Sequence, residues 1–183
     1  MKQKQEIRIR LISQRESLGK DARDNAGDII TRALIDSKIL QDKNNILCYI
    51  PVNNEVETKL LIDDLQALHQ KVYVPAYDND KGRYVFAQFN GWDNLVVGPY
   101  DVMQPVDSQE TDTIDLAILP GVAFDVQCNR LGYGKGVYDK LLAGMACAKI
   151  GLAYDFQIME ELPIEDHDLK MDMVITEKRV IRN

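Results

Sequence analysis

Short apolar runs alternate in this chain with segments of helical period, and that alternation limits the folds open to it. Predicted strands cover residues 45–50, 72–74, 113–119, 150–154 and 173–176. Predicted helices, in which apolar residues recur every three or four positions, cover residues 2–18, 21–37, 58–68 and 137–145. This order is typical of a largely parallel sheet covered by helices. We therefore predict a three-layer α/β/α sandwich, a single domain over residues 1–183, with N-terminal helices in 1–37 and an α/β core in 45–183.

Prolines and polar residues suggest where these elements begin and end. Thr58 is expected to cap the third helix. Pro51 and Pro75 are expected to end the first two strands, because proline lacks the N–H that a sheet requires. Residues 83–89 alternate as an edge strand or hairpin does. Residues 90–112 are expected to be a long irregular connection, of the kind that is often functional.

Composition excludes several classes of protein. The chain has 183 residues, 45% of them hydrophobic, which is enough for one substantial core. It lacks the run of about eighteen apolar residues that spans a membrane, and its first residues lack the apolar stretch of a secretory signal. Its three cysteines have no metal-binding spacing and fit a reducing cytoplasm. The net charge of −7 disfavours nucleic acid as a partner. We expect a cytoplasmic monomer that acts on a small molecule.

The most informative segment is the glycine-rich run at residues 129–139, Asn-Arg-Leu-Gly-Tyr-Gly-Lys-Gly-Val-Tyr-Asp. Its three glycines can take positive φ and let backbone N–H groups converge on an anion. Arg130 and Lys135 add positive charge that suits phosphate oxygens, and Asp139 can hold a divalent cation against them. The run lies between a predicted strand and a predicted helix, where α/β proteins bind anions. Its spacing is neither a Walker A nor a dinucleotide motif, so a simple tight turn is the alternative.

A basic stripe follows the first predicted helix. At 100° per residue, Lys4, Arg8 and Arg15 fall within about 40° of one another. Ile7 and Leu11 lie directly beside them, so the stripe borders the buried face and can overhang a cleft. On the sequence alone, a row of solvated side chains is favoured.

Acidic residues elsewhere allow two interpretations. Glu55 and Glu57 follow the first strand and, from their spacing alone, are expected to face water. The acidic loop around His167 resembles a metal cluster but is more often structural. Asp172 precedes an apolar strand and is either a turn residue or a metal ligand.

Four elements, in order, resemble the 5-formyltetrahydrofolate cyclo-ligase family, also called 5,10-methenyltetrahydrofolate synthetases. The most specific is Leu-Pro-Gly-Val-Ala-Phe-Asp at residues 119–125, followed by the glycine-rich run. Lys4 and Arg8 match a Lys-x-x-x-Arg pair, and residues 54–58 match a Glu-x-Glu-Thr element. The tail at residues 162–172 is similar to the family's closing pattern. The resemblance covers most of the chain.

This resemblance implies ATP- and Mg²⁺-dependent cyclisation of 5-formyltetrahydrofolate to 5,10-methenyltetrahydrofolate, with release of ADP and phosphate. The substrate is a reduced folate, with or without a polyglutamate tail. The formyl oxygen attacks the γ-phosphate, N10 of the folate attacks the formyl carbon, and phosphate leaves. Phosphoryl transfer requires positioning and charge neutralisation rather than a protein nucleophile.

The resemblance also assigns residues. It makes Lys135 and Arg130 catalytic, with Lys135 neutralising the transferring phosphoryl group. ATP would be bound by Lys4, Arg8, Arg130, Leu131, Gly132, Tyr133, Gly134, Lys135, Gly136, Val137 and Tyr138. Folate would contact Ile50, Glu55, Tyr133, Val137 and, as a lid residue, Tyr100. Asp139 and Asp172 would hold Mg²⁺. Arg15 is left as a solvated side chain.

One position departs from the family pattern. The family usually has a tyrosine where this chain has Val137, and the missing ring removes a surface that can pack on substrate. A non-catalytic module that binds nucleotide or folate is therefore an alternative. A phosphosugar isomerase-like enzyme is a third possibility, and it predicts no ATP requirement.

Overall fold

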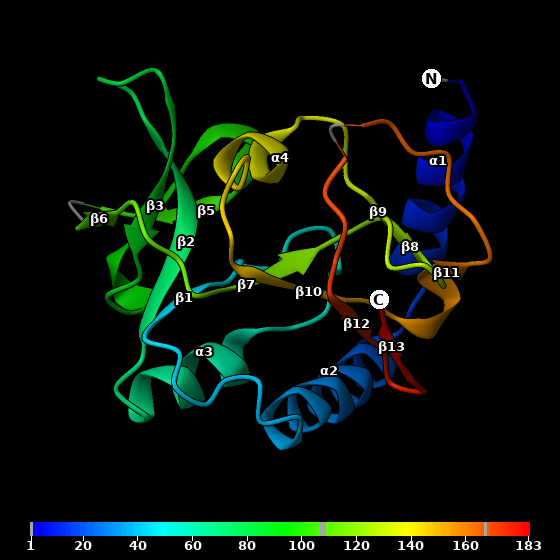
Figure 1. Cartoon of the computed structure of the whole chain (residues 1–183), viewed down its shortest axis with the longest axis horizontal. Coiled ribbons are helices and arrows are strands. Elements are labelled where there is room, and N and C mark those ends of the chain that lie inside the picture. Colours follow the sequence, from blue (N-terminus) through cyan, green and yellow to red (C-terminus); the bar gives the residue numbers. More distant parts are fainter. Residues whose placement is uncertain (1, 107–108, 167) are drawn as a thin grey trace.

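The computed structural model describes residues 2–106, 109–166 and 168–183. Its centre is a sheet whose strand order is β13-β12-β10-β7-β1-β2-β3-β6 (Figure 1). These strands are β1 (Asn45–Leu47), β2 (Lys71–Asp78), β3 (Arg83–Gln88), β6 (Glu110–Thr111), β7 (Leu116–Pro120), β10 (Ala148–Leu152), β12 (Met173–Ile175) and β13 (Val180–Arg182). Strands β12, β10, β7, β1 and β2 pair in parallel. Strand β13 pairs antiparallel with β12 at one edge, and β3 pairs antiparallel with β2 and with the edge strand β6. The predicted largely parallel sheet is confirmed.

Apolar side chains cover both faces of this sheet. Ile46 and Ile118 pack in the core under α2 (Lys20–Asp36) and α3 (Lys59–Ala67). Their neighbours Leu47 and Leu119 belong to a second core that includes residues around α4 (Val137–Leu141). Because side chains alternate along a strand, a nearly continuous apolar run is needed to fill both cores. Figure 1 shows α2 and α3 on one side of the sheet and α4 on the other, as predicted for a three-layer sandwich.

A smaller sheet stands beside the main one and supports the first helix. It consists of β11 (Ile158–Met159), β8 (Ala123–Asp125) and β9 (Arg130–Leu131). Helix α1 (Lys2–Glu16) buries Ile7 and Leu11 in a cluster with Val122 and Leu131. The apolar face predicted for this helix is therefore confirmed, and the basic stripe beside it faces the glycine-rich run.

Several predicted element ends are wrong. Strand β1 ends at Leu47, before Pro51 is reached. Strand β2 continues through Pro75, which pairs with Phe86 of β3. The N–H of Lys71 and the C=O of Tyr73 bond toward the β1 side, so by alternation the N–H that Pro75 lacks would point the same way. Strand β1 ends at Leu47, so at Pro75 strand β2 extends beyond the end of β1. The N–H that proline lacks is therefore not needed for a hydrogen bond between these two strands. Thr58 precedes α3, but its hydroxyl donates to the C=O of Tyr49 at 2.6 Å instead of capping the helix.

The segment predicted to be irregular, residues 90–112, is largely ordered. Its described part contains a hairpin of β4 (Leu95–Val97) and β5 (Met103–Pro105), and β6 joins the main sheet. Short 3-10 turns lie at Trp92–Asn94 and Pro99–Asp101, and a third follows β10 at Asp155–Gln157. The side chain of Gln104 fixes the hairpin by accepting the N–H of Tyr77 and donating to its C=O.

Helix α4 ends at Leu141, not at the predicted residue 145. The buried Leu142 and the positive φ of Gly144 (+74°) turn the backbone back toward β10.

Close packing joins the main sheet to the smaller one at Phe124. A Cβ at Gly121 would lie 2.5 Å from the Phe124 ring, and one at Gly151 would lie 2.4 Å from it. Both distances are shorter than a real contact, so glycine at both positions is what lets the ring fill this space.

Candidate functional site

The glycine-rich run forms a wall between two cavities. It includes β9 and runs into α4, so it starts in the smaller sheet and not directly from β7. Arg130, Gly132, Gly134, Gly136 and Asp139 line the cavities on both sides of it. One segment can therefore touch two ligands at once.

The first cavity, which we call the apolar cavity, has a volume of about 290 Å³. Its lining comes from the ends of β1 and β2, the β4–β5 hairpin and the glycine-rich run. The apolar part of that lining includes Ile50, Val52, Val74, Pro75, Val102, Met103 and Val137. Tyr84, Tyr100 and Tyr133 add aromatic surface. The two carboxylates in the lining are those of Glu55 and Asp139. Such a lining suits a flat, largely apolar ligand with a few polar groups.

The second cavity, which we call the basic cavity, has a volume of about 1160 Å³ and is more polar. Its cationic lining is Lys2, Lys4, Arg8, Arg130, Lys140, Lys149 and Lys170. Carboxylates from Asp139, Glu165, Asp166 and Asp168 lie among them. A cavity with this charge suits a phosphorylated ligand that also brings a divalent cation.

Glycine is required in the wall itself. Gly134 and Gly136 have φ of +89° and +65°, which favour glycine over residues with a side chain. A Cβ at Gly134 would lie 3.4 Å from the guanidinium of Arg8, and Arg8 Nε donates to the C=O of Gly132 at 2.8 Å. Helix α1 is thereby fastened to the wall by one member of its basic stripe.

Arg130 is held in a fixed position at the base of the wall. Its Nε donates to the C=O of Pro120 at 2.8 Å, and its guanidinium lies 5.3 Å from the ring centre of Tyr138. Its Nη1 lies 3.7 Å from Oδ1 of Asp139. Burial lowers the pKa of this guanidinium from its ordinary value, although Asp139 opposes the change. It remains a cation, because an arginine keeps its proton at physiological pH.

Lys4 lies in the basic cavity in contact with the acidic tail. It is buried, with Nζ 2.6 Å from Oδ2 of Asp168 and 3.6 Å from Oε1 of Glu165. An anionic ligand at this ammonium would share it with these carboxylates. His167, between them, lies outside the described residues.

Lys135 is exposed and reaches across the mouth of the apolar cavity. Its Nζ lies 4.6 Å from the ring centre of Tyr100, close enough for a cation–π interaction. Tyr100 sits at the tip of the β4–β5 hairpin with a positive φ of 62°. The predicted lid residue and the predicted catalytic lysine are therefore in contact.

Two expectations about charged residues are wrong. Glu55 is buried, with 3% of its surface exposed, whereas spacing alone favoured water; Glu57 is exposed as expected. Arg15 is also buried, with 1% exposed, and is not a solvated side chain. Its guanidinium donates to the hydroxyl of Tyr133 and, at 3.4 Å, to the C=O of Gly121. The stripe turns inward at Arg15 because α1 lies against the smaller sheet there.

Electrostatics at Glu55 reflect this burial. Loss of solvent raises the pKa of its carboxyl, while the N–H of Val52, the charge of Arg15 and the hydroxyl of Tyr133 oppose the rise. The N–H of Val52 lies 3.1 Å from Oε2. Burial also raises the pKa of Tyr133, so its hydroxyl stays protonated.

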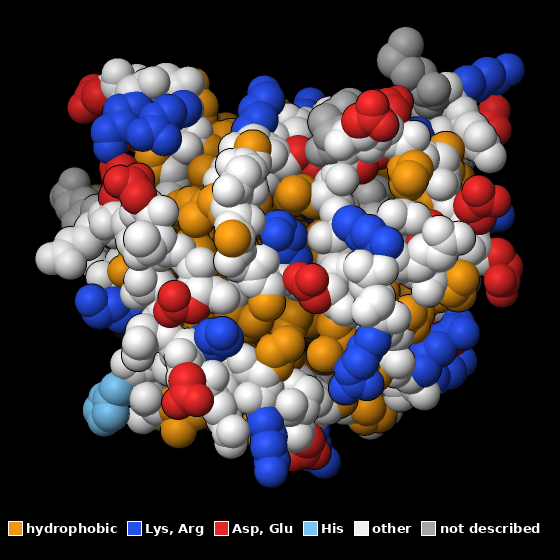
Figure 2. Space-filling model, in the orientation of Figure 1, with side chains coloured by type: hydrophobic (Ala, Val, Ile, Leu, Met, Phe, Trp, Pro, Cys, Tyr) orange, Lys and Arg blue, Asp and Glu red, His pale blue; other side chains and the backbone are white. Residues whose placement is uncertain are grey.

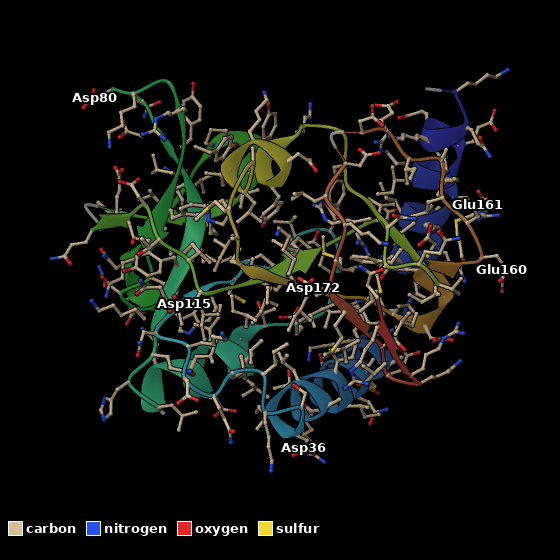
Figure 3. All side chains as sticks on the ribbon, in the orientation of Figure 1. Asp36, Asp80, Asp115, Glu160, Glu161 and Asp172 are labelled. Atoms are coloured by element: carbon tan, nitrogen blue, oxygen red, sulfur yellow. The ribbon has the colours of Figure 1, made fainter. Side chains whose placement is uncertain are left out.

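Of the two predicted metal ligands, Asp139 lines both cavities, and its Oδ1 accepts the N–H of Leu169 at 3.3 Å. Asp172 lies at the start of β12 (Figure 3), where its Oδ2 accepts the N–H of Lys149 at 2.7 Å. It does not appear in the lining of either cavity. Within the described ranges, no group of three or more His, Cys, Asp or Glu residues forms a ready-made metal site.

The remaining predicted site residues have mixed placements. Ile50, Val137 and Tyr138 line the apolar cavity. Leu131 reaches the edge of the basic cavity, but its side chain is buried under α1. The sequence predictions missed Arg15, Tyr84 and the hairpin residues Val102 and Met103. For Arg15 the signal was present in its stripe with Lys4 and Arg8.

Known proteins resemble this chain along nearly all of its length. Residues 1–177 match the model of the 5-formyltetrahydrofolate cyclo-ligase family. The cyclo-ligase of Mus musculus is 26% identical, over 95% of this chain and 93% of its own. That of Escherichia coli K12 is 29% identical, over 75% and 80%.

Solved structures are similar as well. The 5,10-methenyltetrahydrofolate synthetase of Aquifex aeolicus superposes with a TM-score of 0.85 at 29% identity, covering 98% of this chain and 92% of its own. A synthetase from Mycoplasma pneumoniae, at 22% identity and a TM-score of 0.76, covers 95% and 98% and shares the fold. No helix in the described part of the protein has the length and apolarity to cross a membrane. The match over residues 1–177 and the shared fold show that this chain belongs to the 5-formyltetrahydrofolate cyclo-ligase family.

Proposed function

We propose that this protein is an ATP-dependent enzyme that cyclises 5-formyltetrahydrofolate to 5,10-methenyltetrahydrofolate and releases ADP and phosphate. Membership of the cyclo-ligase family is the basis of this proposal. The structural observation that carries it is the glycine-rich wall, which borders an apolar cavity on one side and a basic cavity on the other.

The basic cavity is the proposed ATP site. Lys4 and Arg8 from α1 and the backbone from Arg130 to Tyr138 bind its phosphates. Support comes from the cationic lining and from the contact of Arg8 with the wall. Backbone N–H groups at glycines with positive φ can turn toward an anion without a side chain in the way.

The apolar cavity is the proposed folate site. Its aliphatic and aromatic lining, including Ile50, Tyr133 and Val137, suits the flat pterin ring. A pterin presents adjacent N–H donors, and a buried carboxylate can accept two of them at once. Glu55 is such a carboxylate in this lining, and Tyr100 closes the mouth as a lid.

Chemistry takes place across the wall. The formyl oxygen attacks the γ-phosphorus and the bond to ADP breaks. N10 then attacks the formyl carbon, loses its proton, and the carbon–oxygen bond to phosphate breaks. Arg130 and Lys135 supply the positive charge that such a transfer requires. Arg130 is buried and held by Pro120, so it provides fixed charge, whereas the exposed Lys135 can follow the moving phosphoryl group.

Mg²⁺ fits this site through Asp139, whose carboxylate borders both cavities. When bound with ATP, the ion would neutralise phosphate oxygens. Asp172 is a second proposed ligand, although one of its oxygens already accepts the N–H of Lys149. Mg²⁺ is commonly held by one or two carboxylates, with phosphate oxygens and water in its remaining positions.

A third cavity, of about 510 Å³, offers room for the glutamate tail of the folate. It shares Tyr84, Tyr100, Lys135 and Val137 with the apolar cavity. Arg83 and Lys140 line it and can pair with the carboxylates of a mono- or polyglutamate tail.

The other proposed properties concern partners and compartment. Lysine and arginine side chains are interspersed with acidic ones on the face in Figure 2, which supports a small-molecule partner over nucleic acid. We also propose a monomer. The three cysteines are buried and free, which supports a reducing cytoplasm. Burial raises the pKa of Cys48 to about 12, so this thiol is no nucleophile.

A turnover assay tests the proposal. Purified protein incubated with 5-formyltetrahydrofolate, ATP and Mg²⁺ should form the methenyl product, which is followed by its near-ultraviolet absorbance, and one ADP per product. Omission of ATP should stop the reaction. A folded protein that forms no product under these conditions would refute the proposal.

Val137 favours one second candidate, a non-catalytic module that binds nucleotide or folate. This side chain lines the apolar cavity where the family usually has tyrosine. Such a module would bind ATP or folate in calorimetry and yield no product. If the wild type yields no product, turnover by Val137→Tyr would show that the loss of activity is due to this one side chain.

A further inference from the structure

Arg15 is the most deeply buried cation among the described residues, and none of the roles above uses it. Its exposed fraction is 1%, compared with 6% for Arg130 and 7% for Lys4. Its Nε has no hydrogen-bond partner. A buried guanidinium loses much solvation free energy, so it needs a counter-charge and aligned acceptors nearby.

Tyr133 provides one of those acceptors. Arg15 donates to the Tyr133 hydroxyl, and its guanidinium lies 5.5 Å from the centre of the same ring. Tyr133 stands in the wall between Gly132 and Gly134 and lines the apolar cavity. Its hydroxyl proton is then free to point at a second acceptor, because a phenol can accept and donate together.

Glu55 lies in the same cavity lining as Tyr133 and is the counter-charge. Its carboxylate is 3% exposed. Burial raises the pKa of this carboxyl, and the charge of Arg15 and the hydroxyl of Tyr133 oppose that rise. Two further contacts fix the Glu55 segment: Oε2 accepts the N–H of Val52, and the backbone carbonyl oxygen accepts the hydroxyl of Tyr154 at 3.2 Å. The series Arg15–Tyr133–Glu55 thus links α1, the wall and the end of β1.

We infer that Arg15 is a positioning residue for folate binding: through the Tyr133 hydroxyl it holds Glu55 as an oriented carboxylate in the apolar cavity. The inference rests on the proposed function, in which Glu55 accepts the N–H groups of the pterin.

A second consequence concerns α1. Arg8, from the same helix, contacts the wall on the ATP side, so α1 reaches both ligand sites through the two faces of one loop.

Several other groups face Glu55 and share in its titration. Arg130, from β9, stabilises the carboxylate. Tyr49, after β1, and Tyr138, from α4, are both neutral phenols whose pKa is raised by burial and by Glu55. Since burial raises the pKa of Glu55 and Arg15 opposes that rise, loss of the Arg15 charge moves the pKa of Glu55 further upward. Folate binding then fails at a higher pH than in the wild type.

The test compares Arg15→Gln, which keeps a donor for Tyr133 but loses the charge, with Arg15→Lys, which keeps the charge. Arg10→Gln is the matched control, since Arg10 is an exposed residue of the same helix. We expect Arg15→Gln to raise the folate KM by about tenfold and to leave the ATP KM within about threefold. The acid limb of kcat/KM for folate should move to higher pH, and Arg15→Lys should restore part of both changes.

Tyr133→Phe provides a test that does not depend on Arg15→Gln folding. It removes one hydroxyl from the wall and should also raise the folate KM and shift the acid limb. The inference is overturned if Tyr133→Phe has the wild-type folate KM and pH profile. It is also overturned if Arg15→Gln is folded by circular dichroism and changes the two KM values equally or not at all.

Failure of the proposed function gives a different result. In that case the wild type itself forms no methenyl product, and calorimetry with 5-formyltetrahydrofolate replaces turnover as the readout. Weaker folate binding by Arg15→Gln and Tyr133→Phe than by the wild type and Arg10→Gln still supports the positioning role. Equal binding by all four proteins refutes it.

Discussion

The two cavities beside the glycine-rich run differ in how their charged side chains are held. In the apolar cavity the charges of Glu55 and Arg130 are buried and held by hydrogen bonds, and aliphatic and aromatic side chains form the rest. In the basic cavity Lys2, Lys140 and Lys170 are exposed, and Arg8 and Lys149 are partly exposed. Carboxylates lie among these cations. Buried polar groups are barely screened by salt, whereas exposed charges are. Folate affinity should therefore depend on packing and pH, and ATP affinity on ionic strength.

The largest expected effect is at Lys135, which lines the apolar cavity. Lys135→Ala should lower kcat by about a thousandfold, because it removes charge from the transferring phosphoryl group. The unfolding midpoint should stay the same, since Lys135 is exposed. Turnover and thermal unfolding measure the two outcomes, with the exposed Lys20→Ala as control. Near-normal turnover in Lys135→Ala would show that the wall does not supply this charge.

The second prediction concerns the backbone of the wall. Gly134→Ala places a Cβ at positive φ, 3.4 Å from Arg8, and should lower kcat/KM by roughly a hundredfold through misplacement of the phosphates. Gly82→Ala is the matched control, because Gly82 has φ of +63° and open space around it. Both variants should lose about 1–2 kcal/mol of unfolding free energy. If Gly82→Ala lowers turnover equally, the effect at Gly134 is one of stability.

The third prediction separates the cavities by salt. Arg8→Ala should raise the KM for ATP about tenfold through loss of a charged contact, and it should flatten the rise of that KM with ionic strength. The KM for folate should change little. Steady-state kinetics at several salt concentrations measure both, and Arg10→Ala on the same helix is the control. Equal changes in the two KM values would mean that Arg8 acts through the wall on both sites.

The smallest expected effect is a pH dependence of opposite sign for binding and stability. Because burial raises the pKa of Glu55 above its ordinary 4.5, folate binding should weaken as pH falls through that raised value. The native state holds the proton longer than the unfolded state, so the unfolding free energy should instead decline as pH rises through the same window. Glu55→Gln should remove both trends, as followed by folate titration and urea unfolding. A wild-type pH profile in Glu55→Gln would contradict this.

The two cavities also differ in how much the sequence could reveal. The basic cavity uses Lys4, Arg8 and the glycine-rich run, which are local patterns whose chemistry is visible in a few consecutive residues. The apolar cavity is assembled from the ends of β1 and β2, a hairpin and a helix. Arg15 was misjudged because its partners, Tyr133 and Glu55, are distant in the sequence, and only the fold brings them to it.

The fold was more predictable, because strand and helix periods are local. The errors came where neighbours in space override a local rule. Pro75 does not end β2, since β1 has already stopped beside it. Thr58 does not cap α3, since the C=O of Tyr49 takes its hydroxyl proton.

The ring of Phe124 has a consequence for how this sequence can evolve. Gly121 and Gly151 leave the space that the ring occupies, and the C=O of Gly121 accepts Arg15 and, at 2.9 Å, the side-chain amide of Gln157. Phe124 and the two glycines therefore form one packing unit. Alanine can replace either glycine only if a smaller side chain replaces Phe124. Phe124→Leu should partly rescue Gly151→Ala while each single variant is destabilised. We therefore expect substitutions at these positions to be tolerated in combination rather than singly.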